Sequence, residues 1–310
     1  MERTDNQLLN TILSPQTGAE GDKPLLVVVT GPTASGKTAL AIEIARRLGT
    51  EIVSADSRQI YRGIPITTAV PTAAERAAVP HHLVECKDIT ESYSAASFAE
   101  DAMAILDDLF RRYGCAVVCG GSMMYIDALT KGIDDIPDIS DAVRMRVQQI
   151  YADSGMEAVL AMLQIYDPEY YNTVDRANTR RVMHALEVCL QSGCTYTSLR
   201  TGAVAERPFR TQIVAIDRSR DELFARINAR VDAMVEAGME AEARSMYPYR
   251  HLNALNTVGF KEWFAHFDGT MDRATTIARI AKNTRVYAKK QLLWLSKQPS
   301  VTMVSPDALV

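Results

Sequence analysis

The sequence of 310 residues predicts an α/β fold, a parallel sheet covered by helices, with an all-helical domain inserted into it. Two observations carry this prediction. Up to about residue 130, short apolar runs alternate with segments of helical spacing, as expected for buried parallel strands and their crossover helices. From about 131 to 205 only helical patterns occur, and the strand signature returns after that.

The first part of the chain holds the alternating elements. Strands are predicted where apolar runs are short and continuous, at residues 25–30, 51–54, 83–86 and 115–119. One helix is predicted over 38–48, where Gly49 ends the pattern. Another is predicted to begin with a capping box at Ser97 and Glu100 and to end near Gly114.

The second part of the chain contains the insertion and completes the core. Helical patterns occur at 142–151, 157–165 and 179–191, and a strand is predicted at 211–216. A capping box at Ser219 and Glu222 opens a long helix, and 301–304 is a candidate edge strand. The predicted organisation is therefore a loosely held tail (1–23), an α/β core (24–130 plus 206–310) and a helical insertion (131–205).

The composition is that of an ordinary globular protein, with 47% hydrophobic and 23% charged residues. A net charge of −4 gives no overall signal for nucleic acid, although a local basic surface is enough to bind phosphates. No apolar stretch approaches the roughly 18 residues of a membrane helix. The cysteines form no Cys-x-x-Cys pair, which favours buried thiols at Cys115, Cys119, Cys189 and Cys194. We expect a cytoplasmic monomer without a membrane partner.

A phosphate-binding motif follows the first predicted strand. Residues 31–38 match the P-loop pattern G-x-x-x-x-G-K-[ST], and a helix is predicted after them, as the pattern requires. Backbone N–H groups of such a loop, together with the helix N-terminus, surround an anion. Eight residues are therefore predicted to bind a diphosphate or nucleotide: Gly31, Pro32, Thr33, Ala34, Ser35, Gly36, Lys37 and Thr38. Lys37 supplies a point charge and Thr38 a hydroxyl ligand for Mg²⁺. The core is thus P-loop NTPase-like.

An ATP-using kinase of small metabolites is the rival function, since many P-loop proteins transfer phosphoryl groups. Asp56 follows the second predicted strand, where it is a candidate general base or simply a turn residue. After Cys119 the chain continues with Gly120, Gly121 and Ser122, without the acid that holds Mg²⁺ in ATPases. A third alternative is a nucleotide-dependent RNA-binding module, which would not need Asp56.

Seven motifs, taken in order, resemble those of the tRNA dimethylallyltransferase family. They are G-P-T-A-S-G-K-T, D-S-x-Q-x-Y, P-H-H, Y-S-A-x-x-F, G-G-S-x-x-Y, A-L-E-V and T-R-x-Y-A-K-K-Q-x-x-W. They extend from Gly31 to Trp294 and so cover nearly the whole chain. The first motif alone is shared with many ATP-binding kinases, whereas the ordered set is specific.

The resemblance implies transfer of a dimethylallyl group from dimethylallyl diphosphate to N6 of adenosine-37, the adenine 3′ of the anticodon in tRNA. A P-loop with Mg²⁺ suits this reaction, because the leaving diphosphate gains negative charge. By similarity, Asp56 accepts the proton of the amine, and Ser122 stands near the reacting centre where the family usually has threonine. The target base must leave the anticodon stem-loop to react.

The resemblance also assigns residues to the tRNA side. These are Asp56, Ser57, Arg58 and Gln59, then Ser122, Arg144, Arg180, Arg181, Val182, Met183 and His184, and finally Asn256, Thr257, Val258, Gly259, Phe260 and Lys261. Without this resemblance, an arginine on an exposed helix would be interpreted as an ordinary solvent-exposed residue with no binding role.

A basic segment near the end of the chain indicates nucleic-acid binding independently of the family resemblance. Residues 276–297 contain six basic residues and no acidic one. On a helical wheel Arg279, Lys282, Arg285 and Lys289 share one arc, although Val286 interrupts it. A solvated face normally mixes charges of both signs, so contact with tRNA phosphates is favoured, with Arg285 and Lys289 as the main candidates.

The chain departs from the family pattern mainly on the nucleic-acid side. The departures are Thr67 for a glycine, Val70 for a lysine, Asn178 for an aspartate, His184 and Asn256 for arginines, and Phe260 for a tyrosine. They affect the details of tRNA recognition and leave the phosphate motif intact. The sequence does not decide between dimethylallyl and hydroxylated donors.

Overall fold

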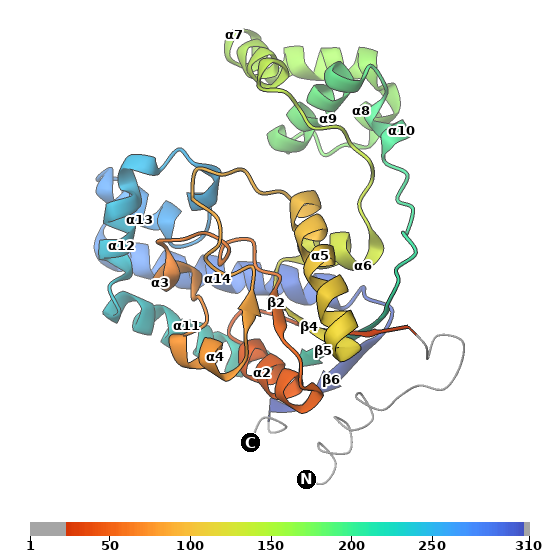
Figure 1. Cartoon of the computed structure of the whole chain (residues 1–310). Helices are drawn as coiled ribbons and strands as arrows, with labels where there is room; N and C mark the ends of the chain where they lie inside the picture. The colour runs from red at the N-terminus through yellow and green to blue at the C-terminus, as the bar shows by residue number, and fades with distance from the viewer. Residues whose placement is uncertain (1–22, 307–310) are drawn as a thin grey trace. The chain divides into compact units, whose positions relative to one another are not determined.

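The structure is a computed structural model that describes residues 23–306 (Figure 1). The predicted tail, residues 1–23, lies outside the described residues except for Lys23. Contacts divide the chain into two compact units. Within the described residues, the α/β unit comprises 23–130 and 206–306, and the helical unit comprises Lys131–Ala205.

The α/β unit is built on a parallel sheet of six strands in the order β3-β2-β4-β1-β5-β6. The strands are β1 (Leu25–Thr30), β2 (Ile52–Ser54), β3 (His81–His82), β4 (Cys115–Cys119), β5 (Arg210–Ile216) and β6 (Val301–Val304). β1 lies in the interior of the sheet, and all of its residues are buried, as its valine-rich sequence predicts. β6 is the edge strand that the sequence indicates.

Helices cover both faces of this sheet (Figure 1). α2 (Lys37–Leu48) packs Leu40 and Ile44 against the face that contains Val27. α5 (Ala95–Tyr113) and α6 (Met123–Lys131) pack against the opposite face, which contains Val28. Adjacent residues of one strand thus face different helices, so the strand is apolar throughout. The predicted α/β fold with a P-loop-like core is confirmed.

Most of the remaining helices of the α/β unit form a third cluster beside the sheet. They are α3 (Pro65–Thr68), α11 (Arg220–Glu236), α12 (Met239–Met246), α13 (Phe260–Phe267) and α14 (Arg273–Leu295), with the 3₁₀ turns η1 (Tyr247–Tyr249) and η2 (Asn253–Leu255). α4 (Ala73–Ala78) leads instead into Val79, which packs with the residues under α2. Trp263 and Phe260 are fully buried at the centre of this cluster and pack with Ile60 and Ile64, which follow β2. Ser219 caps α11 by accepting from Glu222 N at 3.3 Å, as predicted.

The helical unit contains α7 (Asp141–Tyr166), α8 (Pro168–Thr173), α9 (Thr179–Ser192) and α10 (Tyr196–Leu199). Gly155 has φ of 72° and interrupts α7 between the two helices that the sequence predicts there. Val159 and Val182 belong to the buried core of this unit. Asp167 is fully buried and fixes the short helices by accepting from Tyr170 N at 2.9 Å and from Thr197 N at 2.7 Å. No helix of the described chain is long and apolar enough to cross a membrane.

Three sequence-based predictions of local structure are wrong. The strand expected at 83–86 does not form, because Leu83 and Glu85 have positive φ, a conformation that turns the chain away from the sheet. α5 begins three residues earlier than its expected capping box, since Ser94 accepts from Ser97 N at 3.0 Å and caps the helix first. Cys194 is exposed, because it follows the glycine that ends α9.

Candidate active site

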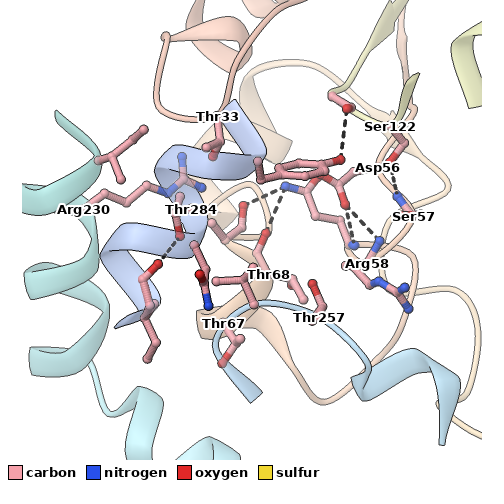
Figure 2. A pocket seen from close by; sticks show the side chains of 18 of the residues that line it. Thr33, Asp56, Ser57, Arg58, Thr67, Thr68, Ser122, Arg230, Thr257 and Thr284 are labelled. Carbon is pink, nitrogen blue, oxygen red and sulfur yellow. Dashed lines mark hydrogen bonds between the residues drawn. The ribbon is translucent and has the colours of Figure 1, made fainter. Parts of the chain in front are cut away.

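A cavity of about 570 Å³ lies in the α/β unit, where the strands at the middle of the sheet end (Figure 2). Three loops at these strand ends line it: the P-loop with Lys37 and Thr38 after β1, residues 56–59 after β2, and residues 120–122 after β4. The carboxyl ends of neighbouring parallel strands share one edge of a sheet, which is why these distant segments meet. α11 and α14 supply further walls, and residues 67–69, Met239, 256–258, Lys261 and Glu262 complete the lining.

The P-loop has the curled backbone that its glycines permit. Gly31 has φ of 133° and Gly36 has φ of 103°, values that side chains rarely tolerate, and Gly36 directly precedes α2. Lys37 Nζ donates to Pro32 O across the loop at 2.9 Å. Burial lowers the pKa of Lys37, since an ammonium far from water lacks solvation, and the charge of Asp56 opposes this shift. A bound diphosphate would give this buried cation its missing counter-ion.

Side chains outside the motif hold the P-loop in place. Arg218 Nε donates to Ser35 O at 2.7 Å, and Arg226 Nε donates to Ala34 O at 2.8 Å. On the other side of the loop, Thr33 N donates to Gln291 Oε1 at 2.9 Å. The loop therefore has its binding conformation fixed by β5, α11 and α14.

Asp56 combines the two roles that the sequence leaves open. Its Oδ1 accepts from Arg58 N at 2.9 Å and from Gln59 N at 3.3 Å, which is the bonding of a turn residue. Its Oδ2 makes no hydrogen bond within residues 23–306, and the residue lines the cavity. The turn therefore aims a carboxylate oxygen that is available for a ligand.

Ser122 lies beside Asp56 because Gly120 allows a close approach of two backbone segments. A Cβ on Gly120 would lie 2.1 Å from Ala55 O, so no larger residue fits there. Ser122 is buried, and its Oγ accepts from Ser57 N at 2.8 Å. The hydroxyl thus joins the loops after β2 and β4 and keeps its own proton to donate into the cavity.

The side chains of Arg58 and Gln59 hold neighbouring loops. Arg58 Nη1 donates to Asn253 O at 2.8 Å, and Gln59 Nε2 donates to Ala69 O at 2.9 Å. Both residues also line the cavity, as does Ser57. Their contacts explain why this segment has a fixed conformation, whether or not it meets a base.

The segment 256–261 lies partly at the cavity and partly in the core. Asn256, Thr257, Val258 and Lys261 line the cavity. Gly259 has φ of 101° with Thr67 packed against it, and Phe260 is fully buried among the apolar residues around Trp263. The side chain of Phe260 is therefore inaccessible to a nucleic acid in this structure.

The tRNA-side residues expected on the insertion all belong to the helical unit. Arg144 on α7 and the group Arg180, Arg181 and His184 on α9 are exposed. Val182 is fully buried in the core of this unit, and Met183 packs against that core, because they occupy the inner face of α9. Val182 therefore has no surface to offer a partner.

The predicted basic arc lies on the outer side of α14. Arg279, Lys282 and Lys289 are exposed, whereas Arg285 is half-buried. Arg285 donates to Asn228 Oδ1 of α11, and both Arg285 and Lys289 lie over the ring of Phe224, at 5.9 and 5.8 Å. α11 thus orients two of the four basic side chains.

Arg230 on α11 is a site residue that the sequence prediction missed. It lines the cavity together with Lys37 and Asp56, and the described part of the chain offers it no hydrogen bond or ion pair. Burial lowers the pKa of Arg230, and the negative charge of Asp56 partly opposes this shift. Figure 2 shows its guanidinium reaching from α11 toward the middle of the cavity. Arg230 follows Arg226 by four residues, so both lie on the face of α11 that meets the P-loop. This spacing is the sequence pattern that could have indicated Arg230.

Tyr287 on α14 also lines the cavity. Burial, followed by the negative charge of Asp56, raises the pKa of Tyr287 to about 12. The hydroxyl therefore stays protonated at neutral pH, and it donates to Gly121 O at 3.3 Å.

Comparison with known proteins identifies the family. Residues 59–298 match a family model described as IPP transferase. The chain belongs to the IPP transferase family. The resemblance predicted from the ordered motifs is thereby confirmed, although the P-loop and Asp56 lie ahead of the matched residues.

Curated relatives cover the P-loop as well. The tRNA dimethylallyltransferase 2 of Porphyromonas gingivalis is 49% identical over 283 residues, which are 91% of this chain and 94% of the relative. The tRNA dimethylallyltransferase 1 of Phocaeicola vulgatus is 46% identical over 282 residues, with shares of 91% and 94%. The solved tRNA isopentenylpyrophosphate transferase of Bacillus halodurans is 33% identical, with a TM-score of 0.67, over 91% of this chain and 90% of that one.

Proposed function

We propose that this IPP transferase family member transfers a dimethylallyl group from dimethylallyl diphosphate to N6 of adenosine-37 in tRNA. The observation that carries the proposal is a single cavity in which the P-loop, a free carboxylate oxygen of Asp56 and the Ser122 hydroxyl converge. The names of the curated relatives support the same pair of substrates.

The diphosphate is assigned to the P-loop end of the cavity. Residues 31–38 provide backbone N–H groups and the N-terminus of α2, while Lys37 and Arg230 provide two half-buried cations. As the C–O bond of the donor breaks, the electron pair stays on the diphosphate, and these groups stabilise the added charge. The anion also neutralises both cations.

The residues present fit Mg²⁺ at this end. The described residues contain no cluster of three or more His, Cys, Asp and Glu that would bind a metal by itself. Thr38 lines the cavity and supplies one hydroxyl ligand, so diphosphate oxygens and water would complete the octahedral shell that Mg²⁺ prefers. When bound, Mg²⁺ neutralises charge on the leaving group.

The adenine amine is assigned to the side of Asp56 and Ser122. As N6 bonds to the allylic carbon, Asp56 Oδ2 accepts the proton that the nitrogen loses. The two backbone N–H bonds to Oδ1 prevent the carboxylate from rotating away. Ser122 donates its hydroxyl proton to a substrate oxygen. Its Oγ also accepts from Ser57 N, which holds the loop that carries Asp56.

The nucleic acid is assigned to basic residues that are exposed or, in the case of Arg285, half-buried. Arg144, Arg180 and Arg181 of the helical unit, with Arg285 and Lys289 of α14, would contact phosphates of the anticodon stem-loop. Location in the cytoplasm and action as a monomer stay predictions.

Transfer of label tests this function. The protein is incubated with dimethylallyl diphosphate labelled in the prenyl group, Mg²⁺ and an unmodified tRNA transcript, and label in the RNA is counted. A transcript with guanosine at position 37 is the matched control. We expect label only in the transcript that carries adenosine-37. Equal labelling of both transcripts, or of neither, contradicts the proposal.

Inhibition by pyrophosphate distinguishes prenyl transfer from the kinase alternative. Because the P-loop is assigned to the donor's diphosphate, pyrophosphate should compete with the donor and raise its apparent KM without changing kcat. ATP hydrolysis in proportion to product would show instead that the loop binds a nucleotide and that the chain is a kinase.

A further inference from the structure

One buried side chain of α14 links two loops of the site. Gln291 is 3% exposed, and its Oε1 accepts from Thr33 N of the P-loop at 2.9 Å. Its Nε2 donates to Gly121 O at 2.9 Å, next to Ser122. A single amide therefore joins the loop assigned to the leaving group with the turn that carries Ser122.

The surroundings of this amide leave it little freedom. A Cβ on Gly121 would lie 2.3 Å from Gln291 Nε2, so the glycine is what allows the amide to reach the turn. Thr33 N and Gly121 O are backbone groups whose positions follow β1 and β4. Because Gln291 bonds to the ends of two neighbouring strands, its length sets the separation between the two loops.

The two hydrogen bonds also have a fixed direction. The amide accepts at the P-loop and donates at the turn, so neither an acid that is ionised nor an apolar side chain can replace it. Gln291 also lines the cavity, but its two bonds hold the amide against the backbone of the two loops.

We propose that Gln291 is a positioning residue, which holds the P-loop and Ser122 at the separation needed for the prenyl transfer proposed above. In that reaction the leaving diphosphate and the attacking amine must lie on opposite sides of one carbon atom. An error in their separation lowers the rate of the chemical step and leaves the binding of each substrate largely intact.

The test uses Gln291→Met, which has a similar length and neither hydrogen bond. Its single-turnover rate with saturating donor and tRNA should fall about 10- to 100-fold, the effect of a misplaced reacting group. Its affinity for pyrophosphate, measured by calorimetry, should change by less than about threefold, since phosphate ligands are untouched. Rates are expressed per folded molecule, with melting temperatures measured in parallel.

The matched control is Gln298→Met. Gln298 follows α14, donates to Trp294 O at 3.3 Å, and does not line the cavity. Its replacement should leave the single-turnover rate within about twofold of wild type, because it orients no loop of the site.

A second variant separates positioning from general stability. In Gln291→Glu, a protonated carboxyl has the donor and acceptor pattern of the amide, while an ionised one loses the donor to Gly121 O. The rate of Gln291→Glu relative to wild type should therefore rise as the pH is lowered, whereas a purely structural role would move only the melting temperature.

Four outcomes are informative. A wild-type rate retained by Gln291→Met overturns the positioning role. So does a fall in its single-turnover rate that is matched by an equal fall in pyrophosphate affinity. A rate of Gln291→Glu relative to wild type that does not change with pH also overturns it. An inactive wild type overturns the proposed function itself, and the two failures are thereby distinguished.

Discussion

The P-loop end of the cavity and the surfaces assigned to tRNA are built differently. At the P-loop, Arg218 and side chains from α11 and α14 fix the backbone, and the cations Lys37 and Arg230 are half-buried. On α9 and α14 the candidate residues are mostly exposed. A group that meets one ligand atom needs a fixed position, whereas a cation near a phosphate backbone acts over a longer range.

The departures from the family pattern lie outside the P-loop, mainly on the nucleic-acid side. Residues 31–38 match their motif at each required position, and the departures lie elsewhere. Asn178 still caps α9, since its Oδ1 accepts from Arg181 N at 3.2 Å as an aspartate would. Phe260 packs its ring in the core. These two exchanges therefore keep the local structure.

The largest expected effect is at Asp56. Asp56→Ala and Asp56→Asn should each lower kcat by about a hundredfold or more, because general-base catalysis typically contributes that much. Asparagine keeps an oxygen for Arg58 N and Gln59 N, so this variant preserves the turn and removes only the base. Pyrophosphate affinity, measured by calorimetry, should survive in both. Near-normal turnover by Asp56→Asn would show that the residue is only a turn residue.

An intermediate effect is expected at Arg230. Arg230→Met should weaken pyrophosphate binding about tenfold to a hundredfold, the range for loss of a hydrogen bond to a charged group. Arg220→Met is the control, since Arg220 lies on the same helix, is exposed and does not line the cavity. The tRNA affinity should be the same in both variants and in wild type. Equal pyrophosphate affinity in the two variants would place the anion away from α11.

The smallest effect is expected on the surface of α14. Replacing Arg285 and Lys289 with glutamine should flatten the log–log dependence of tRNA affinity on salt by roughly one to two units, since each phosphate contact releases counter-ions. All tRNA substrates should weaken alike. The control replaces Arg46 and Arg47 at the end of α2 with glutamine and changes the net charge equally. Parallel lines for wild type and the α14 variant would mean that the RNA lies elsewhere.

The sequence predicts those parts of the site that depend on backbone geometry. The P-loop, Asp56 and the Gly-Gly-Ser turn each follow a buried strand, and parallel strands bring their ends together. The change to helical patterns at about 131 and the return of strands after about 205 coincide with the bounds of the helical unit. Periodicity suffices for this, because it separates helices from buried strands.

The side chains that helices contribute were not predictable in the same way. Arg230 and Gln291 lie on helices. The sequence pattern of these helices shows which face is buried, but it does not show that this face meets the strand ends at the cavity. Val182 shows the opposite error, since the resemblance assigned a whole stretch to tRNA although every helix alternates between core and surface. Tertiary packing decides both cases.

The external support of the P-loop has a consequence for product release. Because Arg218 and Arg226 hold the loop in its curled form, binding an anion orders little additional backbone. Such a site does not distinguish the donor's head group from the diphosphate left after transfer. We therefore expect diphosphate to leave slowly relative to chemistry, so that the first prenylated tRNA per enzyme molecule should form faster than those that follow.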